Sequence, residues 1–368
     1  MKVKKITAFI LAAAICATAV TGCGINTNAT AASMKDQTVT MGMANFACRF
    51  QQASVEDYYK AMLGASSSSD DDSNFWSRDL YGNGSTMEDS MKDSVMEQLH
   101  AMYTLQAHMS DYKIEITDEE KKAIQKAAKQ FLKDNTTEVT KEMSADQDTV
   151  EEFLTLYTIQ KKMQDAIEAE ADTNVTDEEA NERGYSMVTI STTSHTDDSG
   201  NTVEYTDDEK AKLKQDAQAI ADETKAGSTL ADAAKNHDQE ATTGAYASDD
   251  STLDEDVKNA LDALKEGETS DVIETDSALY VVHLDSETDQ EATEKNRQNI
   301  IDKRKTEHYN EVLEGWQKKD GWTVSKKNVA KISFKNSLTQ QDPNASTETE
   351  TQTATQSSTE TQNVESTQ

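Results

Sequence analysis

The sequence predicts an α+β protein, in which a helical N-terminal region and a C-terminal helix flank a smaller segment of mixed strands and helices. Three observations predict this class. Threonine followed by acidic residues recurs as a helix start signal, β-type runs open and close residues 185–285, and an apolar stripe with helical spacing follows residue 290. The mixed segment has about the length of one compact domain.

The chain begins with a segment typical of an export signal. Three lysines among the first five residues precede an apolar run to Val20 that is too short to span a bilayer comfortably. The run ends in Val20-Thr21-Gly22-Cys23, which resembles a bacterial lipobox. This resemblance implies that residues 1–22 are removed and that the Cys23 thiol carries a lipid, which would hold the protein on the extracytoplasmic face of the cell membrane. An ordinary signal peptide that happens to contain a cysteine is the alternative.

The composition favours an exported, acidic protein. The formal net charge is -33, and we see no basic patch beside it, so no nucleic-acid partner is expected. Cys16 would leave with the signal and Cys23 would carry the lipid. Cys48 then has no cysteine partner, and no intramolecular disulfide is expected.

Residues 23–36 are small and polar, which predicts a lipidated tether, and residues 37–180 are predicted to form a helical N-terminal domain. The periodicity and the capping boxes after Thr117 and Thr176 place the helices there at about 44–63, 86–110, 118–133, 146–171 and 177–183. The helix at 86–110 carries a methionine-rich apolar stripe. This stripe is interpreted as core packing, with an adaptable surface for unfolded chains as the alternative.

The mixed segment is predicted to run from a first strand at 185–190 to a last strand at 278–284. A polar excursion at 196–201 is interpreted as a hairpin turn. Between the strands the sequence predicts helices at 207–225, 229–236 and 253–264, with a loop at 243–246.

The C-terminal part begins with an amphipathic helix predicted at 291–319. Short strands are predicted at 322–324 and 329–332, within a C-terminal region of 290–334. Residues 335–368 consist mainly of Ser, Thr, Gln and Glu and are predicted to be disordered, because they carry too few apolar groups to offset the entropy of ordering.

Residues 184–287 resemble the parvulin family of peptidyl-prolyl cis-trans isomerases. The matching pieces are the helix at 230–235, the run 261–273 with its Leu-Lys-x-Gly-Glu-x-Ser pattern, and the closing strand at 279–284. The resemblance implies a small antiparallel sheet covered by helices. It also implies rotation about X-Pro peptide bonds as the activity.

The whole arrangement resembles the PrsA/SurA-type extracytoplasmic foldases. That resemblance implies a helical SurA-N-like chaperone domain, completed by the C-terminal helix, with the parvulin-like domain inserted into it. The implied partners are unfolded or newly exported polypeptides and a membrane reached through the lipid anchor. A homodimer is left open beside a monomer.

The resemblance points to Tyr280 and His283 as candidate catalytic residues. Parvulins usually carry a histidine on each of two neighbouring strands, but here the first position holds Met187 and the second falls at Leu279 or Tyr280. His283, three residues later, is alternatively a surface histidine. Tyr280 is alternatively a core residue. We therefore expect isomerase activity to be weak or absent.

The candidate substrate-binding residues are Met187, Tyr246, Leu253 and Val257. Leu253 and Val257 are apolar where the resemblance implies a prolyl pocket. The family's Gly-Gly-x-Leu-Gly loop is reduced to Thr243-Gly244-Ala245-Tyr246, and its helical Phe is replaced by Asp262.

Neither a metal nor a cofactor is expected. The six histidines show no zinc-ligand spacing, and the loop from Asp197 lacks the glycine and glutamate of a calcium-binding loop. Two functions remain: a foldase that carries an isomerase, and a binding protein that keeps the fold as a holdase without turnover.

Overall fold

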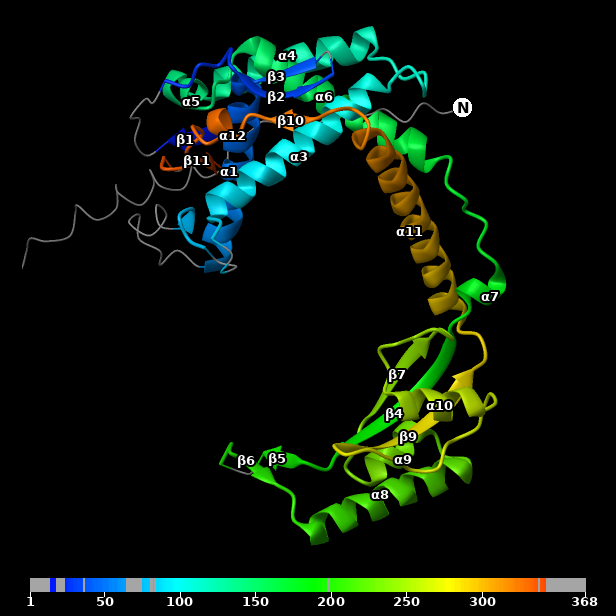
Figure 1. The fold of residues 1–368 in the computed structure, drawn as a ribbon. Coiled ribbons are helices and arrows are strands. Elements are labelled where there is room, and N and C mark those ends of the chain that lie inside the picture. Colours follow the sequence, from blue (N-terminus) through cyan, green and yellow to red (C-terminus); the bar gives the residue numbers. More distant parts are fainter. Residues whose placement is uncertain are drawn as a thin grey trace, which may run out of the picture. The chain divides into compact units, whose positions relative to one another are not determined.

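A computed structural model describes residues 14–17, 24–35, 37–63, 75–79, 82, 84–196, 199–336 and 338–341 (Figure 1). The chain divides into two compact units. The split unit combines Met1–Glu170 with His308–Gln368, and the inserted unit is Ala171–Glu307. The predicted α+β class is confirmed, because helices and small antiparallel sheets build the described residues. Cys23 and most of the predicted signal lie outside them.

The helices of the split unit begin where the capping signals predict. The Thr117 hydroxyl accepts a hydrogen bond from the Glu120 backbone N–H, and the Glu120 carboxylate accepts one from the Thr117 N–H. This exchange satisfies two amides that a helix start leaves unpaired. Thr86 caps the next helix in the same way. The helices of this unit are α1 (Met41–Leu63), α3 (Met87–Ala107), α4 (Asp118–Asp134), α5 (Thr137–Glu142), α6 (Gln147–Glu168), α12 (Lys326–Val329) and the end of α11 (Gln290–Gln317).

Aromatic and methionine side chains fill the core of the split unit. The Phe46 ring meets the edges of Phe131 and Phe153 at centroid distances of 5.7 and 5.3 Å. The methionine-rich stripe on α3 is buried in this core, including Val95, Leu99 and Met102, so core packing is its role. The C-terminal helix completes the unit, because the end of α11 packs on α3 and α6. The side chains in that contact are Leu105, Ile159, Met163, Ile167, Tyr309, Val312, Leu313 and Trp316.

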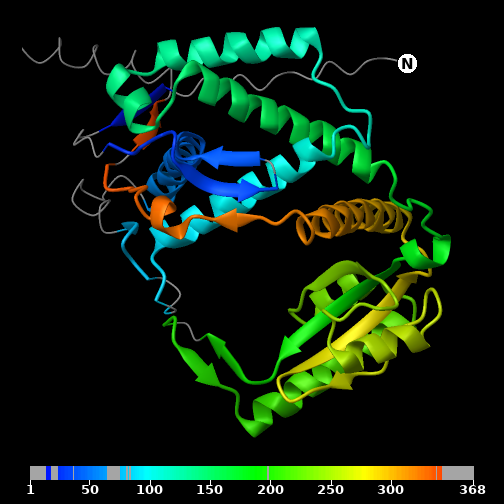
Figure 2. The same ribbon diagram turned by 45° about the horizontal axis from the view of Figure 1, so that its top comes forward.

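A three-stranded sheet lies in the segment predicted to be a tether. The strands β3 (Gln37–Thr40), β2 (Thr30–Met34) and β10 (Thr323–Val324) pair antiparallel, with β2 in the middle (Figure 2). Ala31 and Ala32 are fully buried. The prediction of a tether over 23–36 is therefore wrong from residue 30 onward, because these small side chains fit a close-packed strand.

A buried arginine joins α1 to the C-terminal segment. The Arg49 side chain is 1% exposed and forms an ion pair with Glu142 at 3.3 Å. Its guanidinium also donates to the carbonyl oxygens of Ser333 and Asn336, at 2.8 and 2.9 Å. Burial lowers the pKa of Arg49, while Glu142 opposes that change. The guanidinium thus replaces its water shell with backbone and carboxylate oxygens.

A second buried carboxylate extends this contact. Glu56 accepts hydrogen bonds from the Trp76 indole N–H at 2.7 Å and from the Leu338 backbone N–H at 2.8 Å. Leu338 is fully buried and belongs to β11 (Leu338–Gln341), which pairs with β1 (Ala14–Ala17). The disorder predicted from residue 335 is therefore wrong at Leu338, and the residues after 341 lie outside the described part. The strand predicted at 329–332 is also wrong, since Lys326–Val329 is helical.

The inserted unit is built on a four-stranded antiparallel sheet of order β7-β4-β9-β8. The loop predicted at 243–246 is the end of β7, whose residues pair with the start of β4. The hairpin predicted around 196–201 agrees with the antiparallel pairing of residues 194–196 with 202–204, and residues 197 and 198 of its turn lie outside the described part. The elements are α7 (Asp177–Ala180), β4 (Arg183–Ser191), β5 (Ser194–Thr196), β6 (Thr202–Glu204), α8 (Asp207–Lys225), α9 (Leu230–Asn236), β7 (Ala241–Tyr246), α10 (Glu255–Ala263), β8 (Ile273–Glu274) and β9 (Ala278–Ser286).

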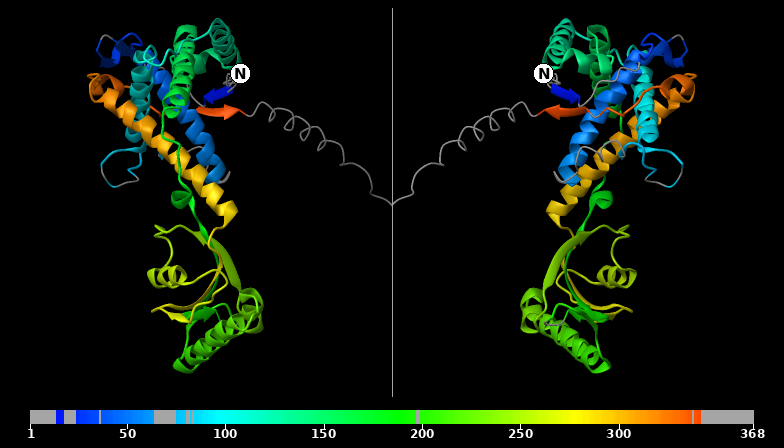
Figure 3. Two further views of the ribbon diagram at one scale, coloured as in Figure 1. Left: turned by 90° about the vertical axis from the view of Figure 1, so that its right-hand side faces the viewer. Right: turned by 90° about the vertical axis from the view of Figure 1, so that its left-hand side faces the viewer.

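The two faces of this sheet have different covers (Figure 3). On one face α8 and α9 pack over Val188, Ile190, Leu279 and Val281, all of which are buried. On the other face the shorter α10 packs beside the sheet and leaves several apolar side chains half-buried. The second face is therefore where a ligand can reach apolar groups.

Hydrogen bonds hold together the chain segments that enter and leave the four-stranded sheet. The Asp289 N–H donates to the Glu182 carbonyl at 2.7 Å, and the Glu182 N–H donates to the Thr293 hydroxyl at 3.0 Å. Farther along α11, Arg297 and Arg304 donate to backbone carbonyls of the incoming chain near residues 174–176. The incoming and outgoing chains thus run side by side where the sheet begins.

Cys48 is a free thiol buried in α1, and burial raises its pKa to about 12. Among the described helices, none combines the length and apolar character that crossing a bilayer requires.

Candidate functional site

The candidate site is the half-open apolar face of the inserted unit. Its floor is formed by the buried side chains of Tyr246, Val257, Leu261, Val282 and Leu284. A partly exposed set packs against this floor. These side chains are Tyr185, Met187, Leu253, Ala260, Leu264, Ile273 and Tyr280.

Strand register explains why residues so far apart in sequence meet here. Met187 lies opposite Val282, and Tyr185 lies opposite Leu284. Side chains alternate between the faces of a strand, so Tyr280 shares the face of Val282 and Leu284. The structure therefore brings together Met187, Tyr280 and the other predicted binding residues, which are Tyr246, Leu253 and Val257.

Burial divides the predicted binding residues into two groups. Tyr246 and Val257 are 0% and 1% exposed, so they support the face from below. Met187, Leu253 and Tyr280 are partly exposed and are the ones that a peptide can touch. The Tyr280 hydroxyl forms no hydrogen bond to any residue that the structure describes, which leaves it available to a peptide carbonyl.

His283 does not join this site. It stands three positions after Tyr280, and an odd spacing on a strand places two side chains on opposite faces. The imidazole Nδ1 lies 2.8 Å from the Thr269 hydroxyl, and the side chain is 23% exposed. The predicted grouping of His283 with Tyr280 is therefore wrong in geometry.

A polar network supports the floor at Tyr246. Arg183 Nη1 donates to the Tyr246 hydroxyl at 2.8 Å, and that hydroxyl donates to Asp262 Oδ1 at 3.0 Å. Lys258 donates to the other Asp262 oxygen at 2.7 Å. Burial, followed by the hydrogen bond to Asp262, raises the pKa of Tyr246 to about 12. The phenol therefore stays protonated at neutral pH.

Asp262 is a residue that sequence analysis treated only as a departure from the family pattern. Burial would raise its pKa, but the hydrogen bonds from Lys258 and Tyr246 outweigh burial and lower it. The signal in the sequence was the four-residue step from Lys258 to Asp262, which places both side chains on one side of α10. Asp262 therefore holds the hydroxyl of Tyr246, which belongs to the floor.

Negative charge surrounds the Tyr185 end of the face. Burial raises the pKa of Glu182, and Asp250, Asp249 and Asp289 raise it further. Burial and Asp250 also raise the pKa of Tyr185. This end of the face suits a ligand that carries a cationic residue beside its apolar ones.

The backbone of Gly244 supports the Tyr185 ring directly. A Cβ at residue 244 would lie 2.7 Å from the Tyr185 hydroxyl oxygen and 2.8 Å from its Cζ. Gly244 and Tyr185 are cross-strand partners on β7 and β4. Glycine is therefore needed at this position for the ring to lie flat across the strand.

We expect Gly244→Ala to displace the Tyr185 ring and to destabilise the inserted unit by about 1–3 kcal/mol, the usual cost of overpacking. Hydrogen exchange of the β4 and β7 amides measures this, with faster exchange expected. Gly315→Ala is the control, since nothing lies within 4 Å of that added methyl group. Unchanged exchange in Gly244→Ala would show that the ring does not depend on the glycine.

A second apolar hollow lies in the split unit, between α1, α3, α4 and α6. It has a volume of about 240 Å³, and its lining includes Phe50, Ile124 and Phe153. Tyr157, at its rim, is 47% exposed. Within the described residues, no cluster of His, Cys, Asp and Glu has the arrangement of a metal site.

Residues 196–295 match the family model described as the PPIC-type PPIase domain. This match overlaps residues 184–287, for which the parvulin resemblance was predicted, and confirms that resemblance. No curated protein matches the chain.

The chain is also similar to several solved structures. Foldase protein PrsA from Lactococcus lactis is 15% identical, with 83% of this chain and 97% of that chain covered, at a TM-score of 0.32. PrsA from Streptococcus pneumoniae is 17% identical, with 66% and 89% covered, at a TM-score of 0.28. A structure described as SurA-like chaperones, PEB4 and Cj1289 of Campylobacter jejuni, is 10% identical, with 81% and 100% covered, at a TM-score of 0.27.

Proposed function

We propose that this chain is a foldase-type chaperone that binds unfolded, newly exported polypeptides and carries a parvulin-type peptidyl-prolyl isomerase domain. One observation carries the proposal. The inserted unit, whose residues 196–295 match the PPIC-type model, presents a half-open apolar face, where Met187, Leu253 and Tyr280 lie over the buried floor of Tyr246 and Val257. Such a face accepts the apolar side of an extended peptide and its proline ring.

The proposal includes a lipid anchor at Cys23 on the extracytoplasmic side of the cell membrane. The lipobox-like end of the leader supports it, and the folded part begins a few residues later. A single acyl anchor holds a protein weakly, whereas a diacylglycerol supplies two chains and holds it stably. The expected partners are unfolded polypeptides and the membrane, with a homodimer left open.

Isomerase chemistry needs a site that binds the twisted amide better than the planar one. The barrier to rotation is about 20 kcal/mol, and only interactions stronger in the twisted state lower it. The apolar face desolvates the amide, and the Tyr280 hydroxyl can donate to a peptide carbonyl. Met187 offers no hydrogen bond donor, and His283 points to the other face. These two residues favour a second candidate function, a holdase with little or no turnover.

The two functions separate in one experiment on the mature chain, residues 23–368. We expect it to suppress aggregation of an unfolded client at near-equimolar ratio. We also expect less than about a twofold acceleration of a proline-limited refolding phase, which takes tens of seconds uncatalysed. Strong acceleration that is lost in Tyr280→Phe would establish an isomerase. Failure to suppress aggregation would remove the chaperone function.

A further inference from the structure

One surface of the split unit is basic although the chain as a whole is strongly acidic. The stretch 318–335 contains six lysines and a single acidic residue, Asp320. Asp320 is 3% exposed and is bonded to His100 and Thr104. All six lysines are exposed, so the charge that this stretch presents to solvent is positive. The six are Lys318, Lys319, Lys326, Lys327, Lys331 and Lys335.

The fold places this stretch beside the start of the folded chain. The α12 helix packs on β2, and the Asn328 amide donates to the Thr30 carbonyl at 2.8 Å. The Ser325 N–H donates to the Ala31 carbonyl at 2.8 Å. Thr30 stands seven positions after Cys23 in the sequence, so the basic stretch contacts the segment that follows the residue proposed to carry the lipid.

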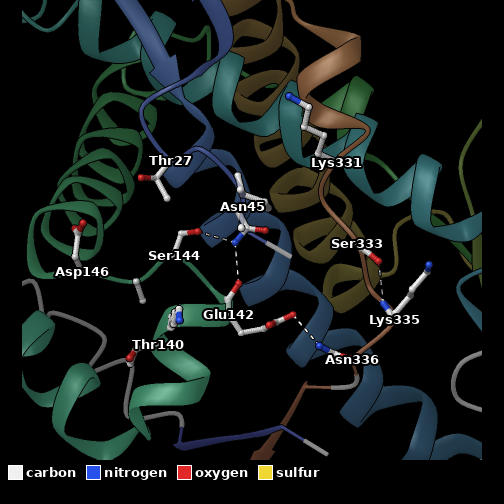
Figure 4. Close-up of a pocket in the computed structure, with 14 residues that line it drawn as sticks. Thr27, Asn45, Thr140, Glu142, Ser144, Asp146, Lys331, Ser333, Lys335 and Asn336 are labelled. Carbon is white, nitrogen blue, oxygen red and sulfur yellow. Dashed lines mark hydrogen bonds between the residues drawn. The ribbon is translucent and has the colours of Figure 1, made fainter. Parts of the chain in front are cut away.

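A hollow of about 530 Å³ continues the basic surface (Figure 4). Gly24, Ile25 and Thr27 line it together with three lysines, which come from α5 and from the C-terminal segment. These lysines are Lys141, Lys331 and Lys335. Residues 24–27 and residues 331–336 therefore line the same hollow, although they are about three hundred positions apart in the sequence.

The acidic groups of this hollow are already engaged. Glu142 accepts from Arg49 and from the Asn336 amide, at 3.3 and 3.1 Å. Asp146 caps α6 by accepting from the Thr149 N–H at 2.8 Å. None of Lys141, Lys331 and Lys335 forms an ion pair with any residue in the described ranges, so the hollow retains a positive charge. Our sequence-based expectation that the chain has no basic patch is wrong here.

We propose that this basic surface binds the phosphate headgroups of anionic phospholipids and sets the orientation of the split unit on the membrane. The lysines of this surface that surround the hollow or lie on α12 form the proposed binding site, and they are Lys141, Lys326, Lys327, Lys331 and Lys335. Lysines near a bilayer are attracted by anionic lipids within about one Debye length. An anionic membrane repels the many carboxylates elsewhere on the chain. Among the exposed lysine clusters, this one lies on the segment joined to the proposed anchor, so it is the one that we expect to approach the membrane. The inference rests on the proposed membrane anchor, which would raise the local concentration of this weak contact.

The test is cosedimentation of the unlipidated mature chain with vesicles. Vesicles of equal parts phosphatidylcholine and phosphatidylglycerol are expected to bind the chain at about 0.1 M salt, where the Debye length is about 10 Å. Vesicles of phosphatidylcholine alone are expected not to bind it. Binding is expected to disappear at about 1 M salt, where the Debye length is about 3 Å.

A fourfold substitution and a matched control locate the contact. K326Q/K327Q/K331Q/K335Q is expected to lower the association constant at least about tenfold. K122Q/K126Q/K129Q/K133Q removes the same charge from four exposed lysines of α4 and is expected to change it less than about twofold. Equal losses in both variants, or none in the first, would overturn the proposal.

The anchor itself is tested separately, by the mass of the N-terminal peptide from chain extracted from bacterial membranes. An unmodified Cys23 together with lysine-dependent vesicle binding would reject the lipid and keep the basic surface. A lipid on Cys23 with no lysine-dependent binding would keep the anchor and reject the surface.

Discussion

Arg49→Met is expected to destabilise the split unit by about 3–5 kcal/mol, the cost of leaving a buried charge without its partner. The substitution removes the hydrogen bonds to Ser333 and Asn336 and leaves Glu142, which is largely buried, unpaired. The C-terminal segment that carries Phe334 and Leu338 then loses part of its attachment to α1 and keeps the hydrogen bond between Leu338 and Glu56. All three tryptophans lie in the split unit, so tryptophan fluorescence during denaturant unfolding measures this unit alone.

Two variants control for the loss of charge. Lys141→Met removes an exposed cation next to Glu142 and is expected to change stability by less than about 0.5 kcal/mol. The double variant R49M/E142Q is expected to recover part of the loss, because it no longer leaves an unpaired carboxylate. If Arg49→Met unfolds at the same denaturant concentration as the parent chain, the guanidinium network does not hold the C-terminal segment.

Met187→Asp is expected to weaken binding of apolar, proline-containing peptides at least tenfold, which corresponds to about 1.4 kcal/mol. The new carboxylate would stand between Tyr185 and Tyr280 on the apolar face, where a bound peptide would remove its water without offering a partner. Fluorescence anisotropy of a labelled peptide gives the dissociation constants. The labelled peptide should carry a cationic residue beside its apolar residues, to match the acidic end of the face near Tyr185.

Ser191→Asp is the matched control for that experiment, because it adds the same charge at an exposed position of the same strand. Its dissociation constant is expected to stay within about a factor of two, in line with the small effects of surface changes. Circular dichroism establishes that both variants keep the fold. Equal affinities for Met187→Asp and the parent chain would place the peptide site elsewhere, with the hollow beside Tyr157 as the next candidate.

Local signals in the sequence predicted the helices well because the side chains that cap a helix lie within its first few residues. The Thr117 and Thr206 capping boxes open α4 and α8 at the predicted residues. The errors occurred where pairing is long-range. The strand β2 pairs with β10, almost three hundred residues later, and no periodicity within five residues reveals such a partner. The strand β7 was predicted as a loop because its glycine and threonines are typical of turns.

The candidate site was predictable as a set of apolar positions but not as a surface. Met187, Leu253 and Tyr280 were identified, whereas the neighbouring Tyr185 was missed because its role depends on the cross-strand Gly244. The position of His283 could have been excluded from the sequence, since an odd step from Tyr280 on one strand changes the face. The Arg183–Tyr246–Asp262 network joins three separate elements and required the structure.

The hydrogen bonds between Glu182, Asp289 and Thr293 suggest how the segment between residues 182 and 289 can be inserted or removed during evolution. A module whose two ends lie one hydrogen bond apart can be gained or lost without a long gap between the flanking segments. Joining residue 182 to residue 289 by a short turn should therefore give a chain that still folds its split unit. A different binding domain could then be inserted into the shortened protein between residues 182 and 289.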